Sequence, residues 1–262
     1  SGQWKDATTW DCSCVPLAYE SVRINNTHTV TLDAAKTIKN IIINNGGILS
    51  ATNRILTVNG DITNNGDYTS SGSVSLYLSG SNTEIDGTGR YGAAAKTVNI
   101  YIKGGSKTIL PGSIFSVQNG KMVVEANKTV QNYGNTTIAG NIEGLNATTS
   151  IWVNQVSAQV HVGGTFFAAG TPGTLNATAT GNTVEYYSSL AQTVTSGSYY
   201  NLAVSNNVTK TLGGNVSVDG SLTMTSANLV TTASYAVTFG TSASSPVEST
   251  TGRIVGKAIM SA

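Results

Sequence analysis

The chain has 262 residues, of which only 10% are charged, and its formal net charge at pH 7 is +1. An average soluble domain is about 25% charged. Nucleic-acid-binding domains gather Lys and Arg on one face, whereas the basic residues here are scattered singly, which argues against a nucleic-acid partner. No stretch reaches the roughly 18 apolar residues of a membrane-spanning helix, so no spanning segment is predicted.

Residues 1–24 are predicted to form a cap and the lead-in to the first strand. Trp4 and Trp10 belong to the densest apolar cluster near either end of the chain, and the first alternating strand is expected at residues 22–24. A solenoid needs a cap because its terminal repeat would otherwise expose its apolar face.

Cys12 and Cys14 are the two cysteines of the chain and stand two residues apart. Three interpretations remain open for them: local thiols or a local disulfide, a disulfide with another chain, and ligation of a metal ion. A second cysteine pair of the kind that zinc sites use is absent, and His28 and His161 are distant in sequence, so no metal site is predicted.

From residue 25 to residue 262, apolar and polar side chains alternate with a period of two, which is typical of strands. In chain order the clearest alternating segments are Thr29–Leu32, Ile55–Val58, Val74–Leu78, Val98–Ile102, Met122–Val124, Ile151–Val153, Val160–Val162, Val216–Val218 and Ala236–Phe239. Asn and Gly separate them, because both residues tolerate the backbone of tight turns. The chain therefore reads as short strands and tight turns.

A recurring phrase favours a solenoid over hairpins. A Lys-Thr or Arg start, an apolar strand, Asn/Gly and a second strand occur at Arg54–Asn64 and again at Lys210–Met224. Strands return about every twenty residues, which suits coils of two or three strands. We predict an all-β, right-handed parallel β-helix over residues 25–262, with a β-sandwich as the alternative. Residues 252–262 end in a strand-like segment, so the coils are expected to continue beyond Ala262 in a longer parent protein.

The first 32 residues carry a family resemblance. Gly2-Gln-Trp4, Thr9-Trp10, Val15-Pro16, Val22-Arg-Ile24 and His28-Thr-Val30 resemble the start of G8-like β-helix modules in large secreted surface proteins of Bacteroidota. Two positions depart from that pattern: Glu20-Ser21 stands where Asp is usual, and Asn26-Thr27 precedes the His in place of Gly. The missing Asp weakens any inherited metal site.

The second half is similar to the same group at Thr183–Tyr187, Tyr199–Val204, Lys210–Met224 and Gly252–Gly256. The resemblance implies export, by the type IX pathway, and display in adhesins, gliding-associated proteins or polysaccharide-handling proteins. It also implies that His28 is a hydrogen-bonding residue of the cap.

Candidate catalytic carboxylates are few and dispersed. Glu84, Asp86 and Arg90 lie within seven residues and form the best local set, since polysaccharide lyases and hydrolases work with carboxylates and a cationic group. A polar turn between coils explains the same residues. Calcium would suit such acids, but the segment has no recognised calcium motif, so no cofactor is predicted.

Aromatic pairs are a second candidate site. Tyr186-Tyr187 and Tyr199-Tyr200, like Phe166-Phe167, should each place one ring in the core and one on the surface, because neighbouring strand residues face opposite ways. The exposed rings would suit carbohydrate, and aromatic packing between coils is the structural alternative. His161 alternates with Val160 and Val162 and is predicted to face solvent.

The sequence therefore predicts a secreted or cell-surface β-helical module that serves as a stalk or adhesion surface, rather than an enzyme. Surface polysaccharide or other cell-surface components are its expected partners. The alternative is a carbohydrate-binding module, or a lyase or hydrolase of the β-helix type.

Overall fold

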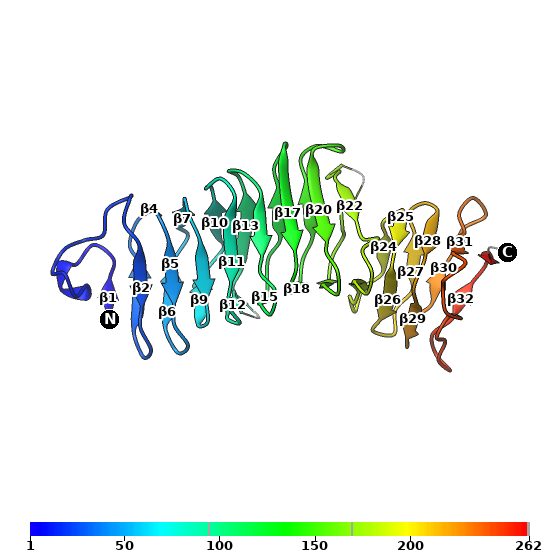
Figure 1. Ribbon diagram of the computed structural model, residues 1–262. Coiled ribbons are helices and arrows are strands. Elements are labelled where there is room, and N and C mark those ends of the chain that lie inside the picture. The colour runs from blue at the N-terminus through cyan, green and yellow to red at the C-terminus, as the bar shows by residue number, and fades with distance from the viewer. Residues whose placement is uncertain (94, 169, 261–262) are drawn as a thin grey trace.

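The chain winds into an elongated parallel β-helix, as the computed structural model in Figure 1 shows. The structure describes residues 1–93, 95–168 and 170–260. Neighbouring strands pair in parallel along the long axis, for example β10 with β13 and β18 with β21. This arrangement confirms the predicted parallel β-helix and shows that the β-sandwich alternative is wrong, since sandwiches are built from antiparallel strands.

Sheet A runs through the whole solenoid and has eleven strands. In order they are β1 (Gly2–Gln3), β3 (Thr29–Leu32), β6 (Ile48–Ala51), β9 (Asp67–Ser70), β12 (Arg90–Tyr91), β15 (Ile114–Val117), β18 (Asn135–Ile138), β21 (Gln159–Val162), β23 (Thr183–Tyr186), β26 (Asn201–Ser205) and β29 (Leu222–Thr225).

Two further sheets complete the earlier coils. Sheet B consists of β2 (Val22–Ile24), β5 (Ile41–Ile43), β8 (Ile62–Asn64), β11 (Thr83–Asp86), β14 (Lys107–Ile109), β17 (Lys128–Asn132), β20 (Ser150–Asn154) and β22 (Thr174–Asn176). Sheet C consists of β4 (Lys36–Ile38), β7 (Ile55–Val58), β10 (Val74–Leu78), β13 (Val98–Ile102), β16 (Met122–Val124) and β19 (Ile142–Gly144). Each of these coils therefore passes through sheets B, A and C in turn.

Two short sheets replace sheets C and B in the last coils. Sheet D consists of β24 (Gln192–Val194), β27 (Lys210–Leu212), β30 (Leu229–Val230) and β32 (Ile254–Val255). Sheet E consists of β25 (Gly197–Tyr199), β28 (Val216–Val218), β31 (Val237–Phe239) and β33 (Ala258–Met260). The change of sheets occurs around residues 163–182, between the green and yellow parts of the ribbon in Figure 1.

Strand alternation fills the core with aliphatic side chains. In β10, for example, Val74, Leu76 and Leu78 are buried while the residues between them face outward. Each apolar side chain stacks on its equivalents in the coils before and after, so every coil depends on its neighbours for burial. No helix in residues 1–93, 95–168 or 170–260 is long and apolar enough to cross a membrane.

The N-terminal cap closes the first coil with two tryptophans. Trp4 is fully buried, its ring centroid lies 4.9 Å from that of Trp10, and Trp10 Nε1 donates a hydrogen bond to the Trp4 carbonyl oxygen at 2.9 Å. The backbone N–H of Trp4 donates to the Thr31 carbonyl oxygen, which ties the cap to sheet A. A short 3-10 helix, η1 (Ala7–Thr9), joins the two tryptophans.

Candidate ligand-binding surface on sheet A

The outer face of sheet A carries one in-register row of side chains along the coil axis. Successive strand pairings align Thr29, Ile48, Asp67, Arg90, Ser116, Thr137, His161, Glu185, Ala203 and Thr223. None of these residues is buried. Because paired strands lie about 4.8 Å apart, the row presents a new side chain to solvent at each coil.

One part of this row is the contact between His161 on β21 and Glu185 on β23. The two residues are directly paired in register, and His161 Nδ1 donates a hydrogen bond to Glu185 Oε2 at 2.5 Å. Ser205, from β26, donates its hydroxyl to the other carboxylate oxygen at 2.6 Å. Three consecutive coils therefore meet at one carboxylate.

These hydrogen bonds set the charge of the carboxylate. The bond from His161, helped by that from Ser205, holds the pKa of the Glu185 carboxyl below its ordinary value, against partial burial, which acts to raise it. Burial raises the pKa of the neighbouring Tyr187 phenol, and the negative charge of Glu185 adds to that effect. Glu185 is therefore an anion and Tyr187 a neutral hydrogen-bonding phenol at neutral pH.

A hollow of about 370 Å³ surrounds this contact, and we call it the sheet A hollow. It is lined by Ile114, Asn135, Thr137, His161, Glu185, Tyr187, Ser205 and Asn206. Ile114 is 48% exposed and Tyr187 is partly exposed, so the hollow offers apolar as well as hydrogen-bonding groups. Such a surface can accept a ligand that offers both hydroxyl groups and an apolar face.

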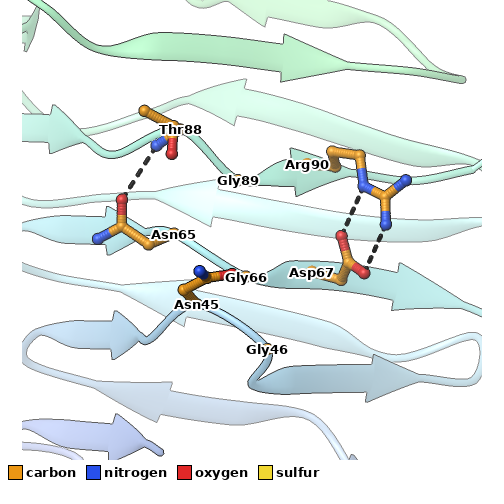
Figure 2. A pocket seen from close by; sticks show the side chains of 8 residues that line it. All are labelled: Asn45, Gly46, Asn65, Gly66, Asp67, Thr88, Gly89 and Arg90. Atoms are coloured by element: carbon orange, nitrogen blue, oxygen red, sulfur yellow. Dashed lines mark hydrogen bonds and ion pairs between the residues drawn. The ribbon is translucent and has the colours of Figure 1, made fainter. Parts of the chain in front are cut away.

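A second hollow of about 640 Å³ lies over the turns that lead from sheet B to sheet A, and we call it the turn groove. Figure 2 shows its lining residues, which come from three stacked turns: Asn45, Gly46, Asn65, Gly66, Asp67, Thr88, Gly89 and Arg90. The N–H of Thr88 donates to Asn65 Oδ1 at 3.1 Å at one end. At the other end Arg90 forms two hydrogen bonds of 2.8 Å with the Asp67 carboxylate.

The three turns under the turn groove stack so closely that only glycine fits at two positions. A Cβ at Gly66 would overlap the carbonyl oxygen of Gly47, and one at Gly89 would overlap that of Gly66. The side chain of Asn64 points inward, donates to the Arg90 carbonyl oxygen at 3.1 Å and accepts from the Gly66 N–H. The polar groups in and beneath the turn groove form hydrogen bonds between coils, so we do not assign a ligand to this groove.

The acids and arginine singled out by sequence do not converge. Glu84 is exposed on β11, and Asp86 on the same strand accepts hydrogen bonds from Ser113 at 2.8 Å and from the Gly87 N–H at 2.7 Å. Arg90 lies beyond the turn, on sheet A, where it pairs with Asp67. The segment is a corner of the coil, where Asp86 and Arg90 each bind a side chain of a neighbouring coil.

The tyrosine pairs divide between core and surface. Tyr186 and Tyr199 are buried, with their hydroxyl oxygens 3.2 Å apart, whereas Tyr187 and Tyr200 are partly exposed. The two outer rings lie at opposite ends of paired strands, because Tyr187 follows β23 and Tyr200 precedes β26, so they form no aromatic row. The expectation that one ring of Phe166-Phe167 faces outward is wrong, since both rings are buried.

The structure also places the remaining predicted residues. Cys12 and Cys14 form a local disulfide in the cap. His28 Nδ1 lies 2.9 Å from the Asn26 carbonyl oxygen, in the turn before β3. Across the described residues, no three His, Cys, Asp or Glu side chains gather in a way that would hold a metal ion.

Sequence reasoning missed two contacts between coils. His161 and Glu185 are separated by 24 positions, and so are Tyr77 and Tyr101, whose rings lie 5.1 Å apart on the outer face of sheet C. Lys103 Nζ lies 4.3 Å from the centre of the Tyr77 ring and 2.9 Å from Glu125. Aligning Val74–Leu78 with Val98–Ile102 would have predicted the tyrosine contact, since each Tyr is the fourth residue of its strand.

No family model, curated protein or solved structure matches this chain. The function is therefore inferred from the surface chemistry of the chain.

Proposed function

We propose that this chain is a rigid, non-catalytic β-helical module of a secreted or cell-surface protein, serving as a stalk or an adhesion surface. The observation that carries the proposal is the unbroken sheet A, whose eleven strands pair from β1 to β29. At about 4.8 Å per strand, such a ladder makes a rod about 50 Å long. Its hydrogen bonds run along the axis, where a stalk must resist extension.

Two observations support an extracellular setting. The Cys12–Cys14 disulfide suits an oxidising compartment, because cytosolic thiols are kept reduced. The phrases around Trp4 and Trp10 resemble exported modules, and we include export by the type IX pathway in the proposal.

The non-catalytic part of the proposal rests on the partners of the carboxylates. Asp67 is held by Arg90, Asp86 by Ser113, and Glu185 by His161 and Ser205. Glycoside hydrolysis requires two carboxylates facing each other across the scissile bond. Carboxylates that hold adjacent coils together are the expected pattern for a scaffold.

Beads coated with the protein test this proposal directly. We expect them to be retained under flow on surfaces coated with polysaccharide, while chromatography of the same polysaccharides finds no cleavage products. Products that disappear in Asp86→Ala or Glu185→Gln would overturn the non-catalytic assignment. Beads that are released as readily as beads coated with albumin would overturn the adhesive role.

Carbohydrate recognition is the second candidate function, and the specific observation in its favour is the sheet A hollow. Its polar groups and its partly exposed Tyr187 ring are the kinds of group that bind sugar.

A further inference from the structure

The sheet A hollow combines an array of hydrogen-bonding side chains with two apolar contacts. Asn135 and Thr137 lie on β18, His161 on β21, Glu185 on β23 and Ser205 on β26. Each strand adds about 4.8 Å along the axis. A ligand made of repeating units of about that length would meet donors and acceptors at each successive coil.

The apolar contacts lie at opposite corners of this array. Ile114 is on β15 and is 48% exposed, three strands from β23, and Tyr187 follows β23 beyond Glu185. The Tyr187 ring offers an aromatic surface for C–H groups, while its hydroxyl and the surrounding side chains serve hydroxyl groups. A sugar ring has both kinds of surface, one apolar face and a rim of hydroxyl groups.

The charges in the hollow favour a neutral ligand. Its lining holds one acid, Glu185, and one base, His161, and they are hydrogen-bonded to each other. An anionic ligand would meet the Glu185 carboxylate with no unpaired Lys or Arg among the lining residues to neutralise it. A cationic ligand would have to displace His161 from its partner.

We infer that the sheet A hollow binds a neutral glycan chain, laid along the coil axis over His161, Glu185 and Ser205 with one sugar ring against Tyr187. This inference rests on the proposed adhesive function and names the class of ligand that the adhesive face would hold. In this arrangement, His161 and Ser205 fix the Glu185 carboxylate as an acceptor for sugar hydroxyl groups.

The test uses calorimetric titration of the full chain with hexasaccharides of glucose, mannose and xylose, and with a hexasaccharide of uronic acids as the charged probe. We expect at least one neutral hexasaccharide to bind and the uronic acid probe to bind at least tenfold more weakly. Tyr187→Ala should weaken binding by about tenfold, because an aromatic contact contributes roughly that much. Tyr187→Phe should stay within about twofold, since the ring remains.

Tyr200→Ala is the matched control. It removes another partly exposed tyrosine, which directly precedes β26 at the far end of the paired strands and lies outside the lining of the hollow, so binding should not change. Circular dichroism of both alanine variants shows whether the fold is retained. Glu185→Gln, which keeps the shape but removes the charge of the acceptor, provides a second variant should Tyr187→Ala fail to fold.

Three results would overturn the inference: no binding of any neutral hexasaccharide, preference for the uronic acid probe, or equal binding by wild type, Tyr187→Ala and Glu185→Gln. These outcomes are distinct from failure of the proposed function. That function fails through cleavage products or loss of bead retention, neither of which is read out in the titration.

Discussion

Sheet A continues through the region where the two sheets beside it end. Sheets B and C end at β22 and β19 and are replaced by sheets E and D, whereas sheet A continues through β21, β23 and β26. The outer row keeps its register there, since His161 pairs with Glu185 and Glu185 with Ala203. An outward position on sheet A can therefore be aligned over the whole rod, which is why the candidate ligand surface lies on this face.

Large aromatic side chains fill the space where sheets B and C are replaced. Trp152, Phe166, Tyr186 and Tyr199 are fully buried, and the ring centres of Trp152 and Phe166 lie 5.7 Å apart. The hydroxyl of Thr195 donates to the Phe166 carbonyl oxygen, and Gln192 donates to the carbonyl oxygens of Val162 and Gly164. Earlier coils combine aliphatic stacks with a smaller aromatic group, Tyr68, Tyr91 and Phe115, on the inner face of sheet A.

We expect the largest loss of stability from removing a buried aromatic ring from this region. Phe166→Ala should lower the free energy of unfolding by about 3–5 kcal/mol, because it removes a fully buried ring and leaves a cavity among other rings. Urea unfolding followed by circular dichroism measures the change. Leu190→Ala is the control, since Leu190 is 73% exposed in the same coils and should change stability by less than about 0.5 kcal/mol. Equal effects of the two substitutions would mean that the aromatic cluster does not hold the sheets together.

A second effect concerns Lys107, a buried lysine of sheet B. Its ammonium group donates to the carbonyl oxygens of Gly80, at 2.5 Å, and Gly105, at 3.1 Å. Burial, with a smaller contribution from Lys128, lowers the pKa of Lys107 to about 8. The unfolded chain therefore holds more protons than the folded one between about pH 8 and the ordinary lysine pKa of about 10.4, so stability should rise with pH in that window.

We expect the free energy of unfolding of wild type to rise by roughly 2 kcal/mol relative to that of Lys107→Met between pH 8 and pH 10, because most of the interval between the folded and the unfolded pKa of Lys107 lies there. Taking the difference between the two proteins cancels the contribution of tyrosine ionisation. Denaturant titrations at several pH values provide the measurement. A constant difference across the window would show that Lys107 has an ordinary pKa.

A smaller effect is expected at the candidate site. Glu185→Gln should cost about 0.5–1 kcal/mol at pH 7, because it weakens hydrogen bonds to a partly exposed carboxylate that is 24% accessible. The folded-state pKa of Glu185 is depressed, so its contribution is present above the ordinary value of about 4.3 and is lost as pH falls through the folded value. The wild-type and variant stabilities should therefore converge below about pH 4. Divergence there would contradict the assignment of Glu185 as the charged acceptor.

The smallest effect is expected at the turn groove. Arg90→Ala breaks a pair whose arginine side chain is 56% exposed, and exposed pairs contribute less than about 1 kcal/mol. Glycan binding should be unchanged, since Arg90 lies outside the sheet A hollow. Loss of binding in this variant would move the ligand surface from the sheet A hollow to the turn groove.

The sequence was sufficient to predict the strands, because their period of two is local. Val74–Leu78 and Val98–Ile102 are strands with the predicted inward and outward faces. It was insufficient for contacts between coils, because coil length varies. His161 meets Glu185 after 24 residues, whereas Glu185 lies opposite Ala203 after 18. No fixed interval predicts such a row.

Closeness in sequence was also a poor guide to closeness in space at a turn between two sheets. Asp86 and Arg90 are four residues apart, yet the turn between them places Asp86 on sheet B and Arg90 on sheet A. Lys107 and Lys210 are the opposite case. Each begins a Lys-Thr phrase, and each ammonium group donates to turn carbonyl oxygens inside the solenoid. The preceding coil supplies Gly80 to Lys107, and Ser188 and Leu190 to Lys210, and these acceptors lie 20 or more residues away in sequence.

Hydrogen exchange across the region where sheets B and C are replaced tests the central claim that sheet A is one continuous platform. The N–H groups of Asn135, Gln159, Thr183 and Leu202 all donate to carbonyl oxygens of adjacent coils. We predict that their protection is uniform from β18 through β26. A step to rapid exchange between β21 and β23 would contradict the account, because it would divide the rod at the proposed binding surface.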